Sequence, residues 1–538
     1  MYTHQPERAN ARFDALMNCK TSIISSETMG LINFIVFCAL SIAASIYLHF
    51  RVLNVADTDP FYHYAHAHLY AIHGPLYASF PWPTISVVSR EPGDLWYGFH
   101  ILLAPMAHAS SSVLWMKFAG AMVTASAIVL FGVALKLARI PFAYMWAFFL
   151  LVASGDEMAR FMMLRPQELS AGLALIVIVA ALDRKALVAV VASFLIVWMH
   201  ITMVTLLVLC VAAAYITGRI FGRPMDWRML GAIALAALAG WLMRPHPWWT
   251  LRLLWVQLAE LFAVKMSGID LDWGTELYPM KASLFWSMYT PFVAAWMVVL
   301  TAAAIGVARK WAVLKAEQSA FLVSTLALSL LFFVMIFVSA SRSKDNWALF
   351  AVAFMAAALA WIVLPRLKEH SRPICAALLA VVIVLLGSMS LPVNQKLLDD
   401  NFSPYRFRDA GNWLRSHAAP GQIVFSSYWM YFSELFFWDP NNLYTGAADP
   451  IFEYSLDHRK FWEWESLNHQ QYFDHVTDQP LTHPGPPIDL HTALRRDFHA
   501  SYILAFRQYQ PRLLSYLQTD RRFKLEYYDG GLGIFRVL

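Results

Sequence analysis

The sequence has little charge and little cysteine, and each scarcity excludes a class of protein. Charged residues make up 14% of the 538 residues, whereas soluble domains carry about 25%, so a soluble globular enzyme is excluded. The four cysteines show neither metal-ligand spacing nor a disulfide framework. There is also no internal repeat, and no inverted pair of broken helices of the kind that transporters carry.

What the chain has in excess is apolar sequence. Hydrophobic residues account for 59% of the chain, and its mean hydropathy is +0.49. Eleven apolar stretches alternate with shorter connections, and each is a candidate membrane span. They cover roughly 31–50, 111–138, 141–154, 168–182, 186–199, 201–217, 229–243, 284–308, 319–340, 347–364 and 374–391. The sequence therefore predicts a polytopic α-helical integral membrane protein, with 186–217 as the least certain pair of spans.

Basic residues gather in alternate connections, which the positive-inside rule assigns to the cytoplasm. They are Lys136, Arg139, Arg184, Lys185, Arg219, Arg223, Arg228, Arg309, Lys310, Lys315, Arg366, Lys368 and Arg372, with Arg8, Arg12 and Lys20 in the amino-terminal tail. Residues 1–30 are then a cytoplasmic tail, and everything after about 392 faces outward. The net charge of +5 is a topology signal here, so we expect no nucleic-acid partner.

Three parts follow from this topology. A membrane domain covers 31–391 and includes an unusually large first outward loop, 51–110. An extracytoplasmic (periplasmic) α/β domain covers 392–538. In it we expect helices over 403–417 and 511–517, strands over 422–426 and 501–506, and a hairpin of 523–528 with 532–537 around Asp529-Gly530-Gly531. The stretch 440–495 is expected to be mainly loop.

The first outward loop opens Asp57-Thr58-Asp59-Pro60-Phe61-Tyr62-His63-Tyr64. Carboxylates at a bilayer edge are costly to desolvate and usually face water, an ion or a substrate. Residues 60–72 predict an amphipathic helix at the membrane interface, with Asp59 as its N-cap and Pro60 at its first position. For Asp59, a role as helix cap alone and a functional role are equally good explanations. The histidines at 63, 66, 68 and 73 are expected to be solvated or individually satisfied, not a metal site.

This motif resembles the Asp-Pro-aromatic-aromatic-polar-Tyr element that follows the first span of oligosaccharyltransferase catalytic subunits and related GT-C glycosyltransferases. Ala65 departs from the family, which often has Arg there. The order of tail, large first loop, multi-span body and outward α/β domain is similar too. The resemblance implies that Asp59 is catalytic, binding metal or acting on the acceptor, with Asp57 as its neighbour.

The second outward loop, 155–168, is similar in position to the family's second acidic motif. The resemblance implies that Asp156 and Glu157, together with Asp59, hold Mg²⁺ or Mn²⁺ through oxygen ligands. Ion pairs of these two carboxylates with Arg160 and Arg165 are the competing interpretation. The GT-C class also contains metal-independent members, so the fold by itself does not imply an ion.

The expected substrate-binding residues are basic or aromatic. Arg342 and Lys344 lie at an outward span junction where the family places a phosphate-binding residue, and arginine can hold phosphate through two parallel donors. Snorkelling beside Asp345 is the alternative for both. Arg165, His63 and Trp429 complete the predicted set. Trp429-Met430 resembles the end of the Trp-Trp-Asp region that reads the acceptor sequon, but a methionine replaces the aspartate, which argues against protein N-glycosylation.

The leading hypothesis is a GT-C-type glycosyltransferase of a bacterial inner membrane. It takes a sugar from a polyprenyl-phosphate-linked donor and transfers it to a glycan, lipid or protein acceptor on the outer face, with membrane lipids around it. Two other classes stay open, a transporter or flippase of a lipid-linked glycan and a non-catalytic glycan-binding membrane protein. A transporter predicts charged side chains near the bilayer midplane, whereas here most charges lie at the ends of the apolar stretches.

Overall fold

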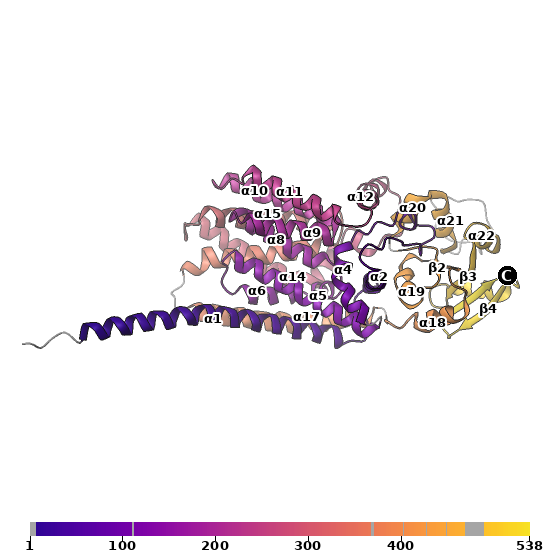
Figure 1. Ribbon diagram of the computed structural model, residues 1–538, viewed down its shortest axis with the longest axis horizontal. Coiled ribbons are helices and arrows are strands. Elements are labelled where there is room, and N and C mark those ends of the chain that lie inside the picture. Colours follow the sequence, from indigo (N-terminus) through magenta and orange to yellow (C-terminus); the bar gives the residue numbers. More distant parts are fainter. Residues whose placement is uncertain are drawn as a thin grey trace, which may run out of the picture.

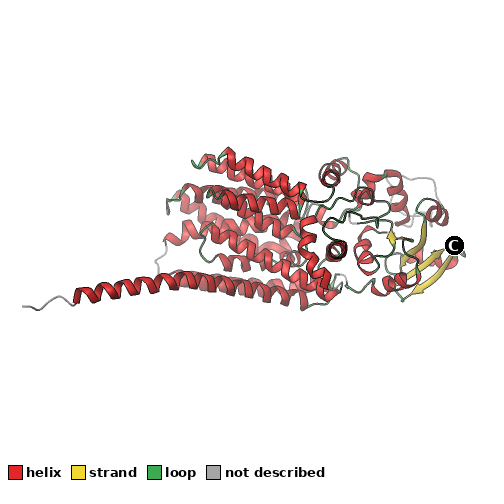
Figure 2. Cartoon of the chain, in the orientation of Figure 1, coloured by secondary structure: helices red, strands yellow, loops and turns green. Residues whose placement is uncertain are grey.

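The computed structural model consists of a helical bundle at one end and a small mixed α/β domain at the other (Figure 1). It describes residues 7–109, 112–366, 371–401, 403–426, 428–447, 449–468 and 489–538, with side chains from residue 28 onward except at residue 468. Helices make up the bundle, and the strands are confined to the carboxy-terminal end (Figure 2). The division near residue 392 that the sequence predicts falls inside the last long helix of the bundle.

Each of the eleven apolar stretches forms a helix. These helices are α1 (Glu7–Phe50), α5 (Val113–Leu137), α6 (Ala143–Leu151), α8 (Gln167–Leu182), α9 (Ala186–Met199), α10 (Val204–Ile220), α11 (Trp227–Leu242), α14 (Ala282–Ala308), α15 (Ala316–Val338), α16 (Ser343–Ala358) and α17 (Arg372–Asp399). A short turn, η1 (Ile201–Met203), leads into α10, and η4 (Leu359–Val363) and η5 (Leu364–Arg366) continue α16. Part of the expected amino-terminal tail is thus helical and continuous with the first span.

Length and composition make seven of the helices in the described residues able to cross a membrane, namely α1, η1 with α10, α5, α14, α15, α16 with η4 and η5, and α17. The helices α8, α9 and α11 are apolar but shorter, and α6 has nine residues. Almost every residue of α8 is buried, as are most of those of α16, so these two lie at the centre of the bundle. The helices α1 and α17 are mostly exposed and lie at its periphery.

Shorter helices cap the bundle on the side of the α/β domain. They are α2 (Asp59–His73), α3 (Val87–Arg90), α4 (Tyr97–Ala109), α7 (Gly155–Phe161), α12 (Pro247–Trp255), the π-helical turn η2 (Val256–Glu260), α13 (Leu261–Met266) and η3 (Thr275–Leu277). The predicted helix after Pro60 is confirmed as α2. Its cap is not the predicted one, because Thr58 holds the N-cap position and no side chain caps the helix. Asp59 lies in the first turn, and its carboxylate pairs with Arg165 instead.

The α/β domain is built on a five-stranded mixed sheet of order β2-β1-β3-β5-β4. Its strands are β1 (Ile423–Phe425), β2 (Leu443–Tyr444), β3 (Ala500–Phe506), β4 (Phe523–Tyr528) and β5 (Leu532–Val537). Its helices are α18 (Arg408–His417), α19 (Phe432–Trp438), α20 (Pro450–Leu456), α21 (His458–Asn468), α22 (Leu490–Arg496) and α23 (Pro511–Thr519). The short turn η7 (Trp429–Tyr431) precedes α19. Strand β1 is parallel to β2 and β3, and β5 is antiparallel to β3 and β4. The predicted hairpin and strands are confirmed. The loop expected over 440–495 is wrong where α20, α21 and α22 form, and its residues 469–488 lie outside the described residues.

The first loop and the α/β domain are joined by backbone and by packing. Tyr444 of β2 exchanges hydrogen bonds with the backbone of Trp82 and Thr84, which adds a short bridge at the sheet edge. On the other side, α2 packs between α4 and α19. Phe61 of α2 meets Phe437 of α19 edge to face at 5.3 Å. The α/β domain is therefore fixed over the end of the bundle where α2 begins.

Candidate active site

The acidic segment of the first loop meets three other connections at the end of the bundle that faces the α/β domain. Asp57 and Asp59 come from the start of α2, and Arg165 from the link between α7 and α8. Glu276 comes from η3 in the long connection before α14, and Asp345 from the first turn of α16. These positions are far apart in the chain, and the bundle brings their side chains into one charged cluster.

Arg165 is the centre of this cluster. Its Nε lies 2.6 Å from Asp59 Oδ2, its Nη2 pairs with Asp57 Oδ2, and its Nη1 lies 2.9 Å from Glu276 Oε1. The Arg165 side chain is 8% exposed and that of Asp59 is 41% exposed, so the arginine is buried beneath an accessible carboxylate. One guanidinium thus holds three carboxylates, and Asp59 is the member that solvent reaches most easily.

A second arginine extends the cluster inward. Arg160 holds Asp345 through Nε at 3.0 Å and Nη2 at 2.7 Å, and its Nη1 donates to Glu276 Oε2 at 2.7 Å. Glu276 therefore bridges the two arginines. Burial would raise the pKa of Glu276, but Arg160, Arg165 and Arg342 together hold that pKa well below its ordinary value. Glu276 is consequently ionised, and it locks the long connection before α14 to the bundle.

Asp57 responds differently to the same surroundings. Burial raises its pKa to about 6, with a further upward contribution from Asp59 and Glu276 that Arg165 opposes. Asp449, the N-cap of α20 in the α/β domain, also has its pKa raised to about 6, mainly by burial. Two carboxyls beside Asp59 are therefore poised to change charge near neutral pH.

The second acidic motif forms its own pair. Lys344 Nζ lies 2.6 Å from Asp156 Oδ2, and Tyr289 donates to the same oxygen at 2.7 Å. Burial would raise the pKa of Asp156, but Lys344 outweighs it and holds the pKa below its ordinary value. Glu157 is 3% exposed, and burial followed by the charges of Asp345 and Asp156 raises its pKa well above the usual range.

These contacts do not fit the predicted divalent-metal set. Asp59 is paired with Arg165 and Asp156 with Lys344, so cationic side chains already occupy these two of the three predicted ligands. In the described part of the chain, the single group of three ligand-type atoms within 4.8 Å of one another comprises His66, Asp94 and His100 and none of the predicted ligands. We therefore derive no step through a metal at Asp59, Asp156 and Glu157.

The predicted basic residues separate into two kinds. Lys344 is buried and engaged by Asp156, which argues against its predicted role in binding substrate. Arg342 is partly exposed, and its Nη2 donates to the neutral amide oxygen of Gln167 at 3.1 Å. Within the described ranges it has no ion-pair partner. Among the basic residues predicted to bind substrate, Arg342 alone forms no ion pair with a described carboxylate, although Glu276 and Asp449 lie near enough to interact with its charge.

His63 lies one helical turn after Asp59 on α2 and is 3% exposed. Its Nδ1 lies 2.8 Å from His100 Nε2, and His100 Nδ1 donates to Asp94 Oδ2 at 2.7 Å. Burial, with smaller contributions from His100 and Arg165, holds the pKa of His63 well below its ordinary value. The hydrogen bonds thus run in one chain from Asp94 through His100 to His63.

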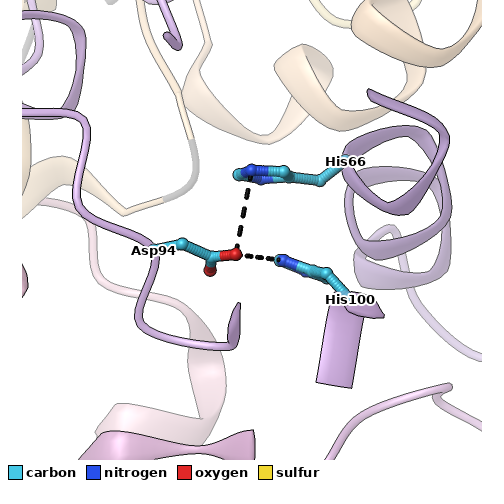
Figure 3. A group of neighbouring side chains, drawn as sticks. All are labelled: His66, Asp94 and His100. Atoms are coloured by element: carbon cyan, nitrogen blue, oxygen red, sulfur yellow. Dashed lines mark hydrogen bonds and ion pairs between the residues drawn. The ribbon is translucent and has the colours of Figure 1, made fainter. Parts of the chain in front are cut away.

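Asp94 is the anchor of this histidine group, and one oxygen of its carboxylate contacts both His66 and His100 (Figure 3). It also accepts hydrogen bonds from Tyr70 Oη and the backbone N–H of Trp96. The His66 and His100 rings stack at 4.4 Å with 21° between their planes, so an ion bound in the plane of one ring lies outside the plane of the other. The group thus fits a buried hydrogen-bond relay better than a metal site, and His63 and His66 each have a hydrogen-bond partner.

Trp429 belongs to the α/β domain and reaches the same end of the bundle. Its Nε1 donates to the carbonyl oxygen of Asp272 at 3.2 Å, and its ring lies beside Gly274. It thereby supports the connection that carries Glu276. The sequence alone does not single out Glu276, Asp345 or Asp94 as site residues, because no spacing in the chain connects them to Asp59.

We expect Arg165→Gln to lower the free energy of unfolding by about 3 kcal/mol, because removing one partner of a largely buried ion pair leaves the other charges uncompensated. The measurement is thermal unfolding of the detergent-purified protein, with Arg309→Gln, an exposed arginine, as matched control. Adding Asp57→Asn to Arg165→Gln restores part of the loss. Unchanged unfolding in Arg165→Gln contradicts the central role of this arginine.

Comparison with known proteins bears on the fold. No protein-family model matches the sequence, and no curated protein matches it either. The fold is similar to the cryo-EM structure of arabinofuranosyltransferase AftD from mycobacteria, with a TM-score of 0.52 and 14% identity, over 93% of this chain and 40% of that one. The chain thus spans about two fifths of that structure's length. The likeness supports the predicted fold, a helical membrane body with a carboxy-terminal α/β domain, and the chain is an integral membrane protein.

Proposed function

We propose that this protein is a membrane glycosyltransferase that transfers a sugar from a polyprenyl-phosphate-linked donor to an acceptor on the side of the α/β domain. The observation that carries the proposal is the meeting of Asp57, Asp59 and Arg165 at one end of the bundle with Arg342, which forms no ion pair with a described carboxylate. The fold shared with a protein named as an arabinofuranosyltransferase supports the reaction class. Such a site offers a base and an anion-binding group within one region.

Asp59 is the group that we assign to the acceptor. Its carboxylate is the most exposed of the three that Arg165 holds, so an acceptor hydroxyl can approach it. In the proposed step the hydroxyl oxygen bonds to the anomeric carbon, the bond from that carbon to the phosphate oxygen breaks, and Asp59 takes the hydroxyl proton. A positioned base typically contributes 10²–10⁴-fold, so charge stabilisation of the leaving phosphate must supply much of the remainder.

Arg342 is the group that we assign to that phosphate. Its guanidinium keeps donors free after bonding to Gln167, and arginine binds phosphate oxygens through parallel hydrogen bonds. Arg160 and Arg165 are held by carboxylates and contribute by keeping Asp59 in place. The charges lie in the connections at the end of the bundle, which favours transfer at the membrane surface over passage of a glycan through the bundle centre.

Asp59→Asn is expected to abolish sugar transfer, because an amide cannot accept the proton, while the protein still inserts and purifies. The assay follows radiolabel from polyprenyl-phosphate sugars into acceptor and the consumption of donor. Asp400→Asn, an exposed carboxylate at the end of α17, is the matched control and keeps activity. Full activity in Asp59→Asn removes this residue from the mechanism, and a wild-type protein that consumes no donor of this class sinks the proposed function.

The pH profile of transfer is expected to rise through about 6. Burial raises the pKa of Asp57 to about 6, so this carboxyl becomes charged and pairs fully with Arg165 as the pH increases across that value. Asp57→Asn should flatten the acidic limb of kcat/KM measured between pH 5 and 8. A limb that persists unchanged in this variant assigns the titration to another group.

Transfer is expected to withstand EDTA. Arg165 and Lys344 already pair with Asp59 and Asp156, two of the three carboxylates that were predicted to hold an ion, so removing divalent cations leaves these two ion pairs intact. The measurement compares initial rates of the purified protein before and after chelation. Loss of activity that Mg²⁺ or Mn²⁺ restores contradicts this expectation without affecting the role of Asp59.

A further inference from the structure

The long connection between α11 and α14 contains a continuous helical segment, 247–266, made of α12, η2 and α13. No apolar stretch of the sequence predicts a helix here. It is not among the candidate membrane spans, and it carries Arg252, Gln257, Glu260 and Lys265 within 20 residues. Figure 1 shows α12 nearly end-on at the junction of bundle and α/β domain, while the bundle helices run along the page. The segment therefore lies across the bundle axis.

One face of this segment is apolar and uncovered. Its members recur every three or four residues and have exposed fractions of 37% to 72%: Trp248, Leu251, Trp255, Leu258, Phe262 and Met266. At 3.6 residues per turn they fall within a stripe of about 80°. We call these six residues the apolar stripe. A soluble surface does not expose a stripe of two tryptophans, a phenylalanine and three aliphatic side chains without a partner.

The opposite face is held by the protein. Thr250, Leu253 and Val256 are buried, and Glu260 accepts a hydrogen bond from Ser455 of α20 at 2.6 Å. Gly93 of the first loop lies against the backbone of Thr250, and a Cβ atom added to Gly93 would lie 2.5 Å from the backbone nitrogen of Thr250. The orientation of the segment is thereby fixed, and the stripe points away from both the first loop and the α/β domain.

The stripe also continues the lipid-facing surface of the neighbouring spans. Trp248 meets Trp241 of α11 edge to face at 5.2 Å, and Leu242 and Met243 at the end of α11 are 48% and 61% exposed. Beyond the segment, Leu284 and Trp286 at the start of α14 are both 46% exposed. The hydrocarbon that surrounds the ends of α11 and α14 is therefore level with the stripe.

We propose that the segment 247–266 is an interfacial helix whose apolar stripe inserts into the membrane leaflet on the side of the α/β domain. The occupant of the stripe is the acyl-chain region of the surrounding lipids. Tryptophan, phenylalanine and leucine on one face of a helix that also carries cations and lies in the membrane plane are the composition that such helices use. Lys265, near the end of this segment, links it to the candidate site, because its Nζ donates to the carbonyl oxygens of Leu277 and Ser339.

This arrangement ties membrane depth to the candidate site. Leu277 directly follows Glu276, which bridges Arg160 and Arg165. An inserted stripe therefore holds the connection that closes the charged cluster at a fixed height above the hydrocarbon. The inference concerns the membrane contact of this helix and does not depend on the proposed reaction.

The test is spin-label accessibility in the full-length protein, reconstituted in nanodiscs of phosphatidylethanolamine and phosphatidylglycerol. The four native cysteines are replaced by alanine, and single cysteines are introduced by Leu251→Cys, Leu258→Cys and Phe262→Cys. Val384→Cys on the exposed face of α17 is the lipid reference, and Ser267→Cys and Tyr528→Cys are the aqueous references. Elution as a single species on size exclusion confirms that each variant folds.

Insertion predicts that the three stripe positions collide preferentially with oxygen, as Val384 does, and are protected from the water-soluble nickel chelate. Collision with the nickel chelate at the level of Ser267 and Tyr528 overturns the proposal. Protection from both reagents, with spin–spin broadening between molecules, overturns it in favour of a second copy of the chain on the stripe. If two stripe positions prefer oxygen and the third does not, only part of the helix is inserted. That result also contradicts the proposal.

Discussion

The candidate site depends on one guanidinium. Asp57, Asp59 and Glu276 would repel one another at the end of the bundle, and Arg165 contacts all three. Arg160 contacts both Glu276 and Asp345, so the same charge network reaches α16. Buried charges are tolerated where each has a partner and its hydrogen bonds are satisfied. The geometry of the first loop, the α7–α8 link and the long connection before α14 is therefore set by electrostatics and not by apolar packing alone.

The α/β domain is part of the same construction. Helix α2, which begins at Asp59, is packed between α4 of the first loop and α19 of the domain. Trp429 supports the connection that carries Glu276, and Asp449 adds a carboxyl whose pKa responds to Arg342. Behind α2, the hydrogen-bond chain from Asp94 through His100 to His63 holds the orientation of two buried rings. The domain thus covers and shapes the charged end of the bundle, and the stripe on 247–266 extends that construction toward the lipid.

Much of the architecture was readable from local patterns. Every apolar stretch became a helix because a run of such residues gains by burial or by lipid contact wherever it lies. Pro60 started α2, and Asp529-Gly530-Gly531 turned the hairpin, because both effects act through neighbouring backbone geometry. The order of large first loop, helical body and carboxy-terminal α/β domain, read from the sequence, agrees with the fold similarity to AftD. The capping role expected for Asp59 was wrong because an arginine distant in sequence offers a stronger partner than a backbone N–H.

The sequence by itself determined the membrane class, the helices of the eleven apolar stretches, the α/β domain and Asp57, Asp59, Arg165 and Arg342 as residues of interest. Only the tertiary structure decided which charged side chains pair with one another. Glu276 contacts two arginines, Lys344 contacts Asp156, and Asp94 contacts two histidines. The physical reason is range. Helix formation depends on residues three or four positions apart, whereas an ion pair depends on a distance in space that the packing of the whole bundle sets.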